Sequence, residues 1–271
     1  MSQLACELDV PAFTSGCPDR GQRVQVIPQS SACYPVPVMR SLICVILLLT
    51  VVSAASAQRT MDRVLITHIK KEIATSAFGD AAWKRAKKVV IETYWSGETA
   101  PATRKFEARL LWSATALYVR FVAEQHEPLV VSTRPDLEKK VRGLWDRDVC
   151  EIFIAPDRAT PNKYFEFEVA PTGEWIDLGI EVTPEKRVTD WDYTSGMEAA
   201  ATIEKNKVIE VIKIPFKALG RAPKGGDIWL GNLFRCVGAG ATRGYLAWRP
   251  TKTKEPAFHV PTAFGEFEFM K

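Results

Sequence analysis

A tryptophan in a charged loop and the carboxylates that follow it give the clearest chemical signal in the sequence. Trp145 stands within KKVRGLWDRD, three residues before Asp148 and six before Glu151. A large apolar ring in such a loop is expected to be covered, either by the fold or by a ligand. A sugar presents a face of C–H groups edged by hydroxyls, which suits a flat ring beside carboxylate or guanidinium groups. Two readings stay open: Trp145 binds a sugar, or it is a lid on one end of the fold.

Glu151 interrupts what otherwise reads as a buried strand. In DVCEIFI, the period-2 alternation of a strand places Glu151 on one face with Val149 and Phe153, and Cys150 on the opposite face. A carboxylate between two apolar side chains must pair with a cation or meet a polar ligand, because an unpaired buried charge is costly. The sequence therefore indicates a polar partner for Glu151.

Two further glutamates follow in KYFEFEVAP, which alternates more regularly. We expect Phe165 and Phe167 to face the core, and Glu166 and Glu168 to face solvent. Together with Glu151, these carboxylates could in principle act as the acid and base of a glycoside hydrolase. The sequence holds no G-x-S-x-G, H-E-x-x-H or P-loop motif. Catalysis is therefore the less favoured alternative.

The cysteines and histidines do not predict a metal site. Cys150 and Cys236 stand in strand-like apolar runs, where two independent buried thiols are favoured over a disulfide. A zinc site needs more ligands than these, and the histidines show no ligand spacing: His68, His126 and His259. We therefore predict no metal and no cofactor.

The candidate residues sit in a succession of short alternating segments that begins near Arg104. Pro, Gly, Asp and Asn separate the segments, which is typical of an antiparallel β-sandwich. The clearest strands are KFEARLLW, ALYVRFVAE, DVCEIFIA, KYFEFEVA, EWIDLGIE, EAAATIEK, KVIEVIKIPF, DIWLGNLFRC, GYLAWRP and GEFEF. Helix is confined to short pieces at about 80–87 and 216–219. No repeat or linker divides residues 58–271, so we predict one all-β domain.

The N-terminal part reads as an export signal. In MRSLICVILLLTVVSAASAQ, a charged start precedes an apolar run and a small-residue A-x-A ending. The run is shorter than the roughly twenty residues that span a bilayer. Residues 39–57 are predicted to be a signal peptide cleaved after Ala57, with a retained anchor as the alternative. Residues 1–38 read as a non-native or disordered extension before a true start at Met39, or else as a long n-region. We expect a secreted or periplasmic protein without a stable membrane anchor.

The composition and the distribution of charge bear on which kinds of molecule the protein binds. The chain has 271 residues, of which 46% are hydrophobic and 25% charged, and a formal net charge of +4. Such a chain can bury a sizeable core. Its basic residues are dispersed and form no stripe with interleaved aromatics, so nucleic acid is not an expected partner.

The order of several motifs resembles carbohydrate-binding module family 9 and its broader family-9-like branch. W-x-x-D-x-x-E-I-F, the later LAW-x-P and the closing FG-x-F-x-F occur in the family's order, and the resemblance covers about 78–271. It implies a jelly-roll β-sandwich in an exported bacterial protein. It also implies a non-catalytic role in polysaccharide breakdown, beside a glycoside hydrolase, with sugars such as glucan or xylan chain ends held between two tryptophans.

The resemblance assigns roles to individual residues. Trp145 matches the first stacking tryptophan, Glu151 the hydroxyl-binding glutamate and Trp248 the second tryptophan. Where the family has an arginine and an asparagine in the next strand, this chain has Glu168 and Ala170. The departure removes two hydrogen-bond donors and adds a negative charge.

A cation is therefore needed to neutralise Glu151 and Glu168. We expect Arg235, or else Arg120, to supply it. The ligand-binding set is then Trp145, Glu151, Trp248, Glu168 and Arg235. The alternatives are a glycoside-active enzyme, a domain that has lost sugar binding, or a periplasmic electron-transfer domain, because related sandwiches hold a haem between methionine and histidine or lysine.

Overall fold

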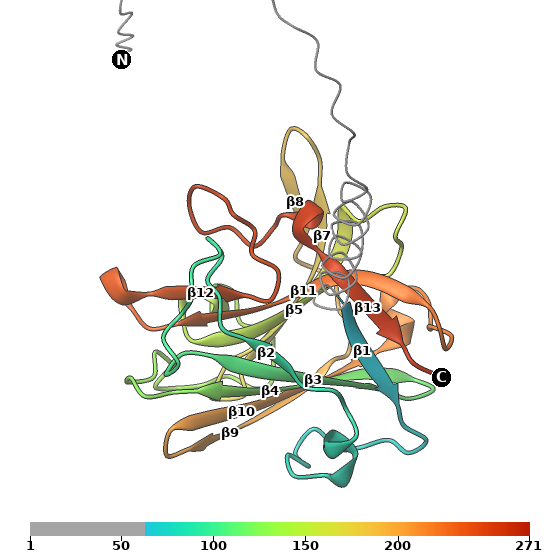
Figure 1. The fold of residues 1–271 in the computed structure, drawn as a ribbon, viewed down its shortest axis with the longest axis horizontal. Coiled ribbons are helices and arrows are strands. Elements are labelled where there is room, and N and C mark those ends of the chain that lie inside the picture. The colour runs from blue at the N-terminus through green and yellow to red at the C-terminus, as the bar shows by residue number, and fades with distance from the viewer. Residues whose placement is uncertain (1–62) are drawn as a thin grey trace, which may run out of the picture. The chain divides into compact units, whose positions relative to one another are not determined.

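Two β-sheets packed face to face form the core of the computed structural model, which describes residues 63–271 (Figure 1). The predicted all-β sandwich is confirmed. The predictions for 1–38, for the signal peptide at 39–57 and for cleavage after Ala57 lie outside the described residues.

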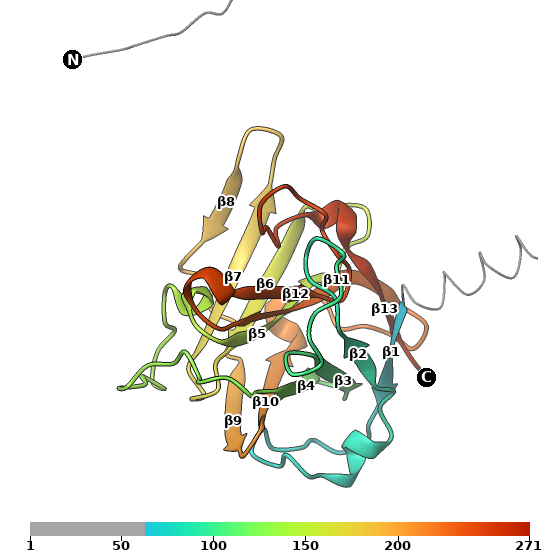
Figure 2. The ribbon, with the colours of Figure 1, turned by 60° about the vertical axis from the view of Figure 1, so that its left-hand side comes forward.

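The first sheet carries the candidate site. Its strands, in order across the sheet, are β8 (Arg187–Asp190), β7 (Trp175–Val182), β6 (Lys163–Val169), β5 (Val149–Ala155), β11 (Ile228–Val237) and β13 (Gly265–Phe269), and β12 (Gly244–Ala247) pairs with β11. All of these neighbours are antiparallel. Figure 2 shows β7 and β8 extending beyond the rest of the sheet as a hairpin.

The second sheet lies against the first. Its strands are β3 (Phe106–Trp112), β4 (Ala116–Glu124), β10 (Lys207–Pro215) and β9 (Glu198–Glu204), with β2 (Val89–Ile91) paired to β3. The described helices are all single 3-10 turns: η1 (Ala81–Lys84), η2 (Leu144–Asp146), η3 (Phe216–Leu219), η4 (Gly240–Thr242) and η5 (Pro261–Ala263). Among the described residues, none of the helices has the length and apolarity needed to cross a membrane.

One strand departs from the predicted antiparallel pattern. β1 (Arg63–His68) runs parallel to β13 along its first part and parallel to β3 at its end, so it joins the edges of the two sheets. Parallel pairing is possible here because nearly the whole described chain separates β1 from β13, which leaves ample length for the crossover.

Period-2 alternation divides the buried side chains of the first sheet between two clusters. The interior cluster, between the sheets, includes Cys150, Phe167 and Val237. A second cluster lies on the outer face of the first sheet and includes Phe153 and Cys236. The two free thiols therefore belong to opposite faces of one sheet. Because the outer face is itself packed, side chains that point outward from β5 and β6 are buried.

Candidate functional site

Trp145 is carried by a short turn on the outer face of the first sheet. Gly143 starts this turn with φ 78°, in the left-handed region that favours glycine, and η2 follows. Leu144 is fully buried in the outer cluster, while Trp145 packs against its edge and is half-buried. Its ring centroid lies 6.1 Å from that of Trp191, with the planes tilted by 43°. The turn therefore presents one aromatic ring at the surface beside a second.

Arg243 holds this turn from the β11–β12 connection. Its guanidinium donates hydrogen bonds to the backbone carbonyls of Gly238, Trp145 and Arg147. One fork of donors thus ties the loop of Trp145 to the sheet.

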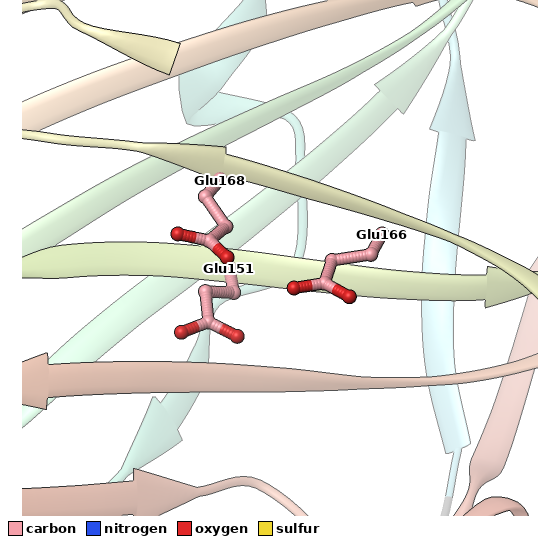
Figure 3. A group of neighbouring side chains, drawn as sticks. All are labelled: Glu151, Glu166 and Glu168. Atoms are coloured by element: carbon pink, nitrogen blue, oxygen red, sulfur yellow. The ribbon is translucent and has the colours of Figure 1, made fainter. Parts of the chain in front are cut away.

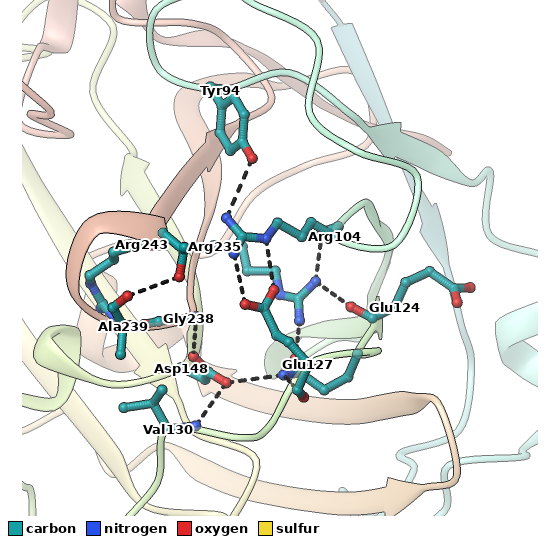
Figure 4. Close-up of polar contacts among 12 residues, drawn as sticks. Tyr94, Arg104, Glu124, Glu127, Val130, Asp148, Arg235, Gly238, Ala239 and Arg243 are labelled. Carbon is teal, nitrogen blue, oxygen red and sulfur yellow. Dashed lines mark hydrogen bonds and ion pairs between the residues drawn. The ribbon is translucent and has the colours of Figure 1, made fainter.

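Asp148 anchors the start of β5 through a buried network (Figure 4). Its carboxylate accepts hydrogen bonds from the backbone N–H groups of Val130 and Gly238 at 3.1 and 2.7 Å, and from the Gln125 amide at 3.3 Å. Burial raises the pKa of Asp148, and those backbone donors act against the shift. Asp148 therefore positions the turn of Trp145 and does not face a ligand.

Arg235 belongs to the same network. Its side chain points into the sandwich, donating to the backbone carbonyls of Arg104 and Glu124 and to the Gln125 side chain. The expectation that Arg235 neutralises Glu151 is wrong. On β11, Phe234 stands opposite Glu151 and shares its outer face, and alternation turns the next residue, Arg235, to the interior face with Cys150. Arg120, the other expected cation, lies on β4 in the second sheet.

Three glutamates gather on the outer face of the first sheet (Figure 3). Glu151 on β5 stands directly opposite Glu168 on β6, and Glu166 is two residues before Glu168 on the same face. One carboxylate oxygen from each lies within 4.8 Å of the others. The prediction that Glu166 and Glu168 meet solvent is wrong, because the exposed fractions are 2% for Glu151, 3% for Glu166 and 0% for Glu168. The loops that build the outer cluster cover them.

Burial dominates the electrostatics of this cluster. It raises the pKa of Glu151 and of Glu168 well above the usual range for a carboxyl, and the negative charges of the neighbouring glutamates add to both shifts. The pKa of Glu166 is also raised by burial. The Cys236 thiol donates to Oε1 of Glu151 at 3.5 Å. The arrangement can hold protons or a cation.

A small pocket of about 140 Å³ opens above Glu166. It is lined by Trp145, Glu166, Leu178, Arg187, Thr189, Trp191 and His259. The pocket combines two indole rings with a carboxylate, a guanidinium, a hydroxyl and an imidazole.

His259 enters the pocket from the segment before η5. Its Nδ1 lies 2.7 Å from the Tyr164 hydroxyl and its Nε2 lies 3.9 Å from Oε2 of Glu166. Burial lowers the pKa of His259 to about 3, so the ring is neutral at physiological pH. It can donate or accept a hydrogen bond but brings no positive charge.

Trp248 is not part of this pocket. It follows β12 directly, on the same side as Leu246, and packs against the interior cluster. Its ring stacks on Phe267, with centroids 5.6 Å apart and planes at 16°. The structure therefore does not bring Trp248 to Trp145, and Trp191 occupies the neighbouring position instead.

The sequence reasoning missed Trp191, Arg187 and His259. Trp191 carried a usable signal, because it stands in the polar stretch TDWDYTSG just as Trp145 stands in a charged loop. Arg187 and His259 carried none, because nothing in the residue pattern around either of them marks it as part of a site.

Comparison with known proteins gives one family and a set of similar folds. Residues 76–271 match the model of the family described as carbohydrate family 9 binding domain-like. No curated protein matches the chain.

Three solved structures share the fold. A putative carbohydrate-binding protein from Bacteroides uniformis has a TM-score of 0.58 at 15% identity, covering 76% of this chain and 98% of its own. A carbohydrate binding module family 9 from Caldicellulosiruptor kristjanssonii in complex with glucose has a TM-score of 0.55 at 15% identity, covering 76% and 95%. The same kind of module from that organism in complex with cellotriose has a TM-score of 0.55 at 15% identity, covering 77% and 93%.

Proposed function

The chain belongs to the carbohydrate family 9 binding domain-like family, and on this premise we propose that it is an exported, non-catalytic carbohydrate-binding protein that assists polysaccharide breakdown. The observation that carries the proposal is the half-buried Trp145 at a pocket that combines a second indole ring with a carboxylate, a guanidinium, a hydroxyl and an imidazole. A sugar ring stacks its C–H face on the exposed face of Trp145 and directs its hydroxyls into the pocket.

The polar walls of the pocket supply both donors and acceptors. Glu166 offers carboxylate oxygens, and Thr189 offers a hydroxyl. Arg187 offers the guanidinium donors that Glu168 and Ala170 do not provide in the strand after Glu151. Glu151 and Glu168 neighbour Glu166 without lining the pocket.

Glucose-based oligosaccharides are the first ligands to test. Two of the similar structures, of carbohydrate binding modules, are complexes with glucose and with cellotriose. Those modules are only 15% identical to this chain, so xylose- and galactose-based oligosaccharides belong in the same panel.

Export and the assistance to a glycoside hydrolase rest on the sequence. The proposed signal peptide ends at Ala57, so protein secreted by its host is expected to begin at Gln58. Mass determination of the N-terminal peptide tests this. An N-terminus upstream of residue 58 in all of the exported material contradicts the proposed cleavage.

The binding experiment follows tryptophan fluorescence of the purified protein during titration with each sugar. We expect a saturable change with at least one oligosaccharide. Trp145→Ala is expected to weaken binding at least about tenfold, which corresponds to about 1.4 kcal/mol. Trp248→Ala is the matched control, because it removes the same ring from the opposite face of the sheet and should leave the affinity unchanged.

Two results would contradict the proposal. Unchanged fluorescence with every sugar, together with unchanged pull-down on insoluble polysaccharide in Trp145→Ala, removes the binding role. Turnover of aryl glycosides that disappears in Glu151→Gln replaces the non-catalytic role with an enzymatic one.

A further inference from the structure

Three buried carboxylates converge where, among the described residues, no lysine or arginine is in direct contact with them. Within residues 63–271, neither lysine nor arginine forms an ion pair with Glu151, Glu166 or Glu168. Nε2 of His259 lies 3.9 Å from Oε2 of Glu166, which is beyond hydrogen-bond distance. The guanidinium of Arg243 donates its hydrogen bonds to three backbone carbonyls and to none of these carboxylates. The cluster therefore has no lysine or arginine counter-charge in direct contact among the described residues.

Of the three glutamates, Glu168 has the least contact with solvent and the fewest hydrogen-bond partners. It is fully buried, and apart from the neighbouring carboxyl group of Glu166 its two carboxylate oxygens have no hydrogen-bonding group beside them among the described residues. Oε2 of Glu166 is also buried without a partner. Buried polar atoms are nearly always satisfied in folded proteins, so these oxygens indicate a missing partner. The partner must meet Glu151 and Glu166 as well, because Glu168 is aimed at both (Figure 3).

Repulsion among the three carboxylates is a second reason why the cluster needs a partner. Three like charges at such separations in a low-dielectric environment repel strongly, and each unpaired charge is costly to bury. Either protons or a cation must therefore occupy the cluster. A divalent cation satisfies all three groups at once, whereas protons satisfy them one at a time.

The geometry points to Ca²⁺ as the cation. We propose that Glu151, Glu166 and Glu168 bind one calcium ion on the outer face of β5 and β6. The separation of their oxygens, within 4.8 Å, matches ligands around Ca²⁺, whose oxygen ligands lie at about 2.3–2.6 Å. Mg²⁺ demands near-ideal octahedral geometry and gives up its waters reluctantly, whereas Ca²⁺ accepts several carboxylates in a flexible arrangement, which suits a buried cluster of three glutamates better.

The ligand chemistry and the access route agree with this assignment. Carboxylates are the hard oxygen ligands that Ca²⁺ prefers, and three of them offer up to six oxygens when bidentate. The 140 Å³ pocket reaches Glu166 from outside and gives the ion and its remaining waters a path to the cluster. The positive charges of Arg243 and Arg187 act on Glu151 and Glu166, and they offset the negative charge that remains after Ca²⁺ has bound.

The test uses the purified protein, stripped with chelator and titrated with Ca²⁺ in a sugar-free buffer at pH 7.5. Calorimetry is expected to show about one site, and Tm is expected to rise by several degrees at a hundred times the Kd. Because sugar is absent, failure of calcium binding and failure of sugar binding are separate results.

Two variants locate the site. Glu168→Gln keeps the shape of the side chain and removes one charge, so we expect Ca²⁺ affinity to fall at least about a hundredfold. The apo variant should still fold, because the substitution relieves repulsion in the buried cluster. Glu204→Gln, an exposed glutamate on β9 of the second sheet, should bind Ca²⁺ like the unaltered protein. Tb³⁺ emission excited through tryptophan provides a second readout and should disappear only in Glu168→Gln.

Three results would overturn the proposal. The first is the absence of heat, Tm shift and Tb³⁺ emission at millimolar Ca²⁺, which would leave protons as the occupants. The second is undiminished affinity in Glu168→Gln, which would move the ion elsewhere. The third is tighter binding of Zn²⁺ or Mg²⁺ than of Ca²⁺, which would refute the choice of ion.

Discussion

Trp145 and Trp248 lie on opposite sides of one β-sheet. Trp145 packs against the outer cluster beside Trp191, whereas Trp248 stacks on Phe267 at the edge of the interior cluster. The two rings therefore cannot hold one sugar between them. Trp145 belongs to the proposed sugar site, whereas Trp248 contributes to the packing of the core.

Trp248→Ala is expected to reduce stability and leave sugar affinity unchanged. Removing a half-buried ring that stacks on Phe267 should lower the free energy of unfolding by about 2–3 kcal/mol. Urea unfolding measures the first effect, and the fluorescence titration measures the second. If Trp248→Ala lost sugar binding without losing stability, Trp248 would be part of the binding site and the prediction would be wrong.

Arg187→Ala is expected to weaken sugar binding by about tenfold. Arg187 is exposed on β8 and lines the pocket, so its removal should change the free energy of unfolding by no more than about 0.5 kcal/mol. Calorimetric titration with the best oligosaccharide measures the affinity. Arg187→Lys keeps the charge without the planar fork of donors and should recover only part of the affinity. Arg120→Ala, on the second sheet, is the control, and an equal loss there would show that charge alone matters.

Most of the fold could be predicted because alternation is a local signal. The expected ALYVRFVAE and GEFEF coincide with β4 and β13, and the other expected segments differ from their strands by a few residues at most. β1, β2 and β8 were not expected. β2 and β8 have only three and four residues, which is too few for a sustained period to show unless the neighbouring residues extend it. The parallel placement of β1 depends on pairing with the far end of the chain, which no local pattern reports.

The candidate site was only partly predictable. The spacing of Trp145 and Glu151 and the neighbouring Glu168 could be obtained from the sequence, because β5 and β6 are consecutive strands. The burial of Glu168 could not, because it depends on loops that fold over the outer face. The side of the sheet on which Trp248 lies was accessible in principle, since alternation in GYLAW places it with Leu246 and away from Ala247.

Arg243→Lys is expected to loosen the turn that carries Trp145. The guanidinium binds the carbonyls of Gly238, Trp145 and Arg147 together, and a lysine ammonium cannot reproduce this fork. We expect a loss of about 1–2 kcal/mol in stability and faster hydrogen exchange at residues 143–147. Sugar affinity should fall several-fold although Arg243 does not line the pocket.

Exchange measured by mass spectrometry on peptides from this region tests the expectation. Arg221→Lys is the control, because Arg221 is an exposed partner of Asp227 on another part of the surface. Unchanged exchange at 143–147 in Arg243→Lys would mean that the buried Leu144 and the Asp148 network hold the turn without it.

Glu210 is expected to make the protein less stable as the pH rises from about 4.5 to about 7. It is buried on β10, and burial raises its pKa to about 7, opposed by the Cys150 thiol and the Arg235 guanidinium and reinforced by Asp148. Between the two pKa values the unfolded chain has lost the proton and the folded chain retains it. Unfolding then releases a proton, so rising pH favours the unfolded state. The shift of about 2.5 pH units corresponds to about 3 kcal/mol, complete above pH 7.

Glu210→Gln isolates this contribution, because glutamine is neutral at every pH. The difference in unfolding free energy between the variant and the unaltered protein should grow in favour of the variant from pH 4.5 to 7 and then stay constant. Urea unfolding at half-unit steps of pH, with Glu204→Gln as the exposed control on the adjacent β9, measures this difference. A difference that is flat with pH would mean that Arg235 keeps Glu210 ionised inside the sandwich. The interior network would then contain a true ion pair.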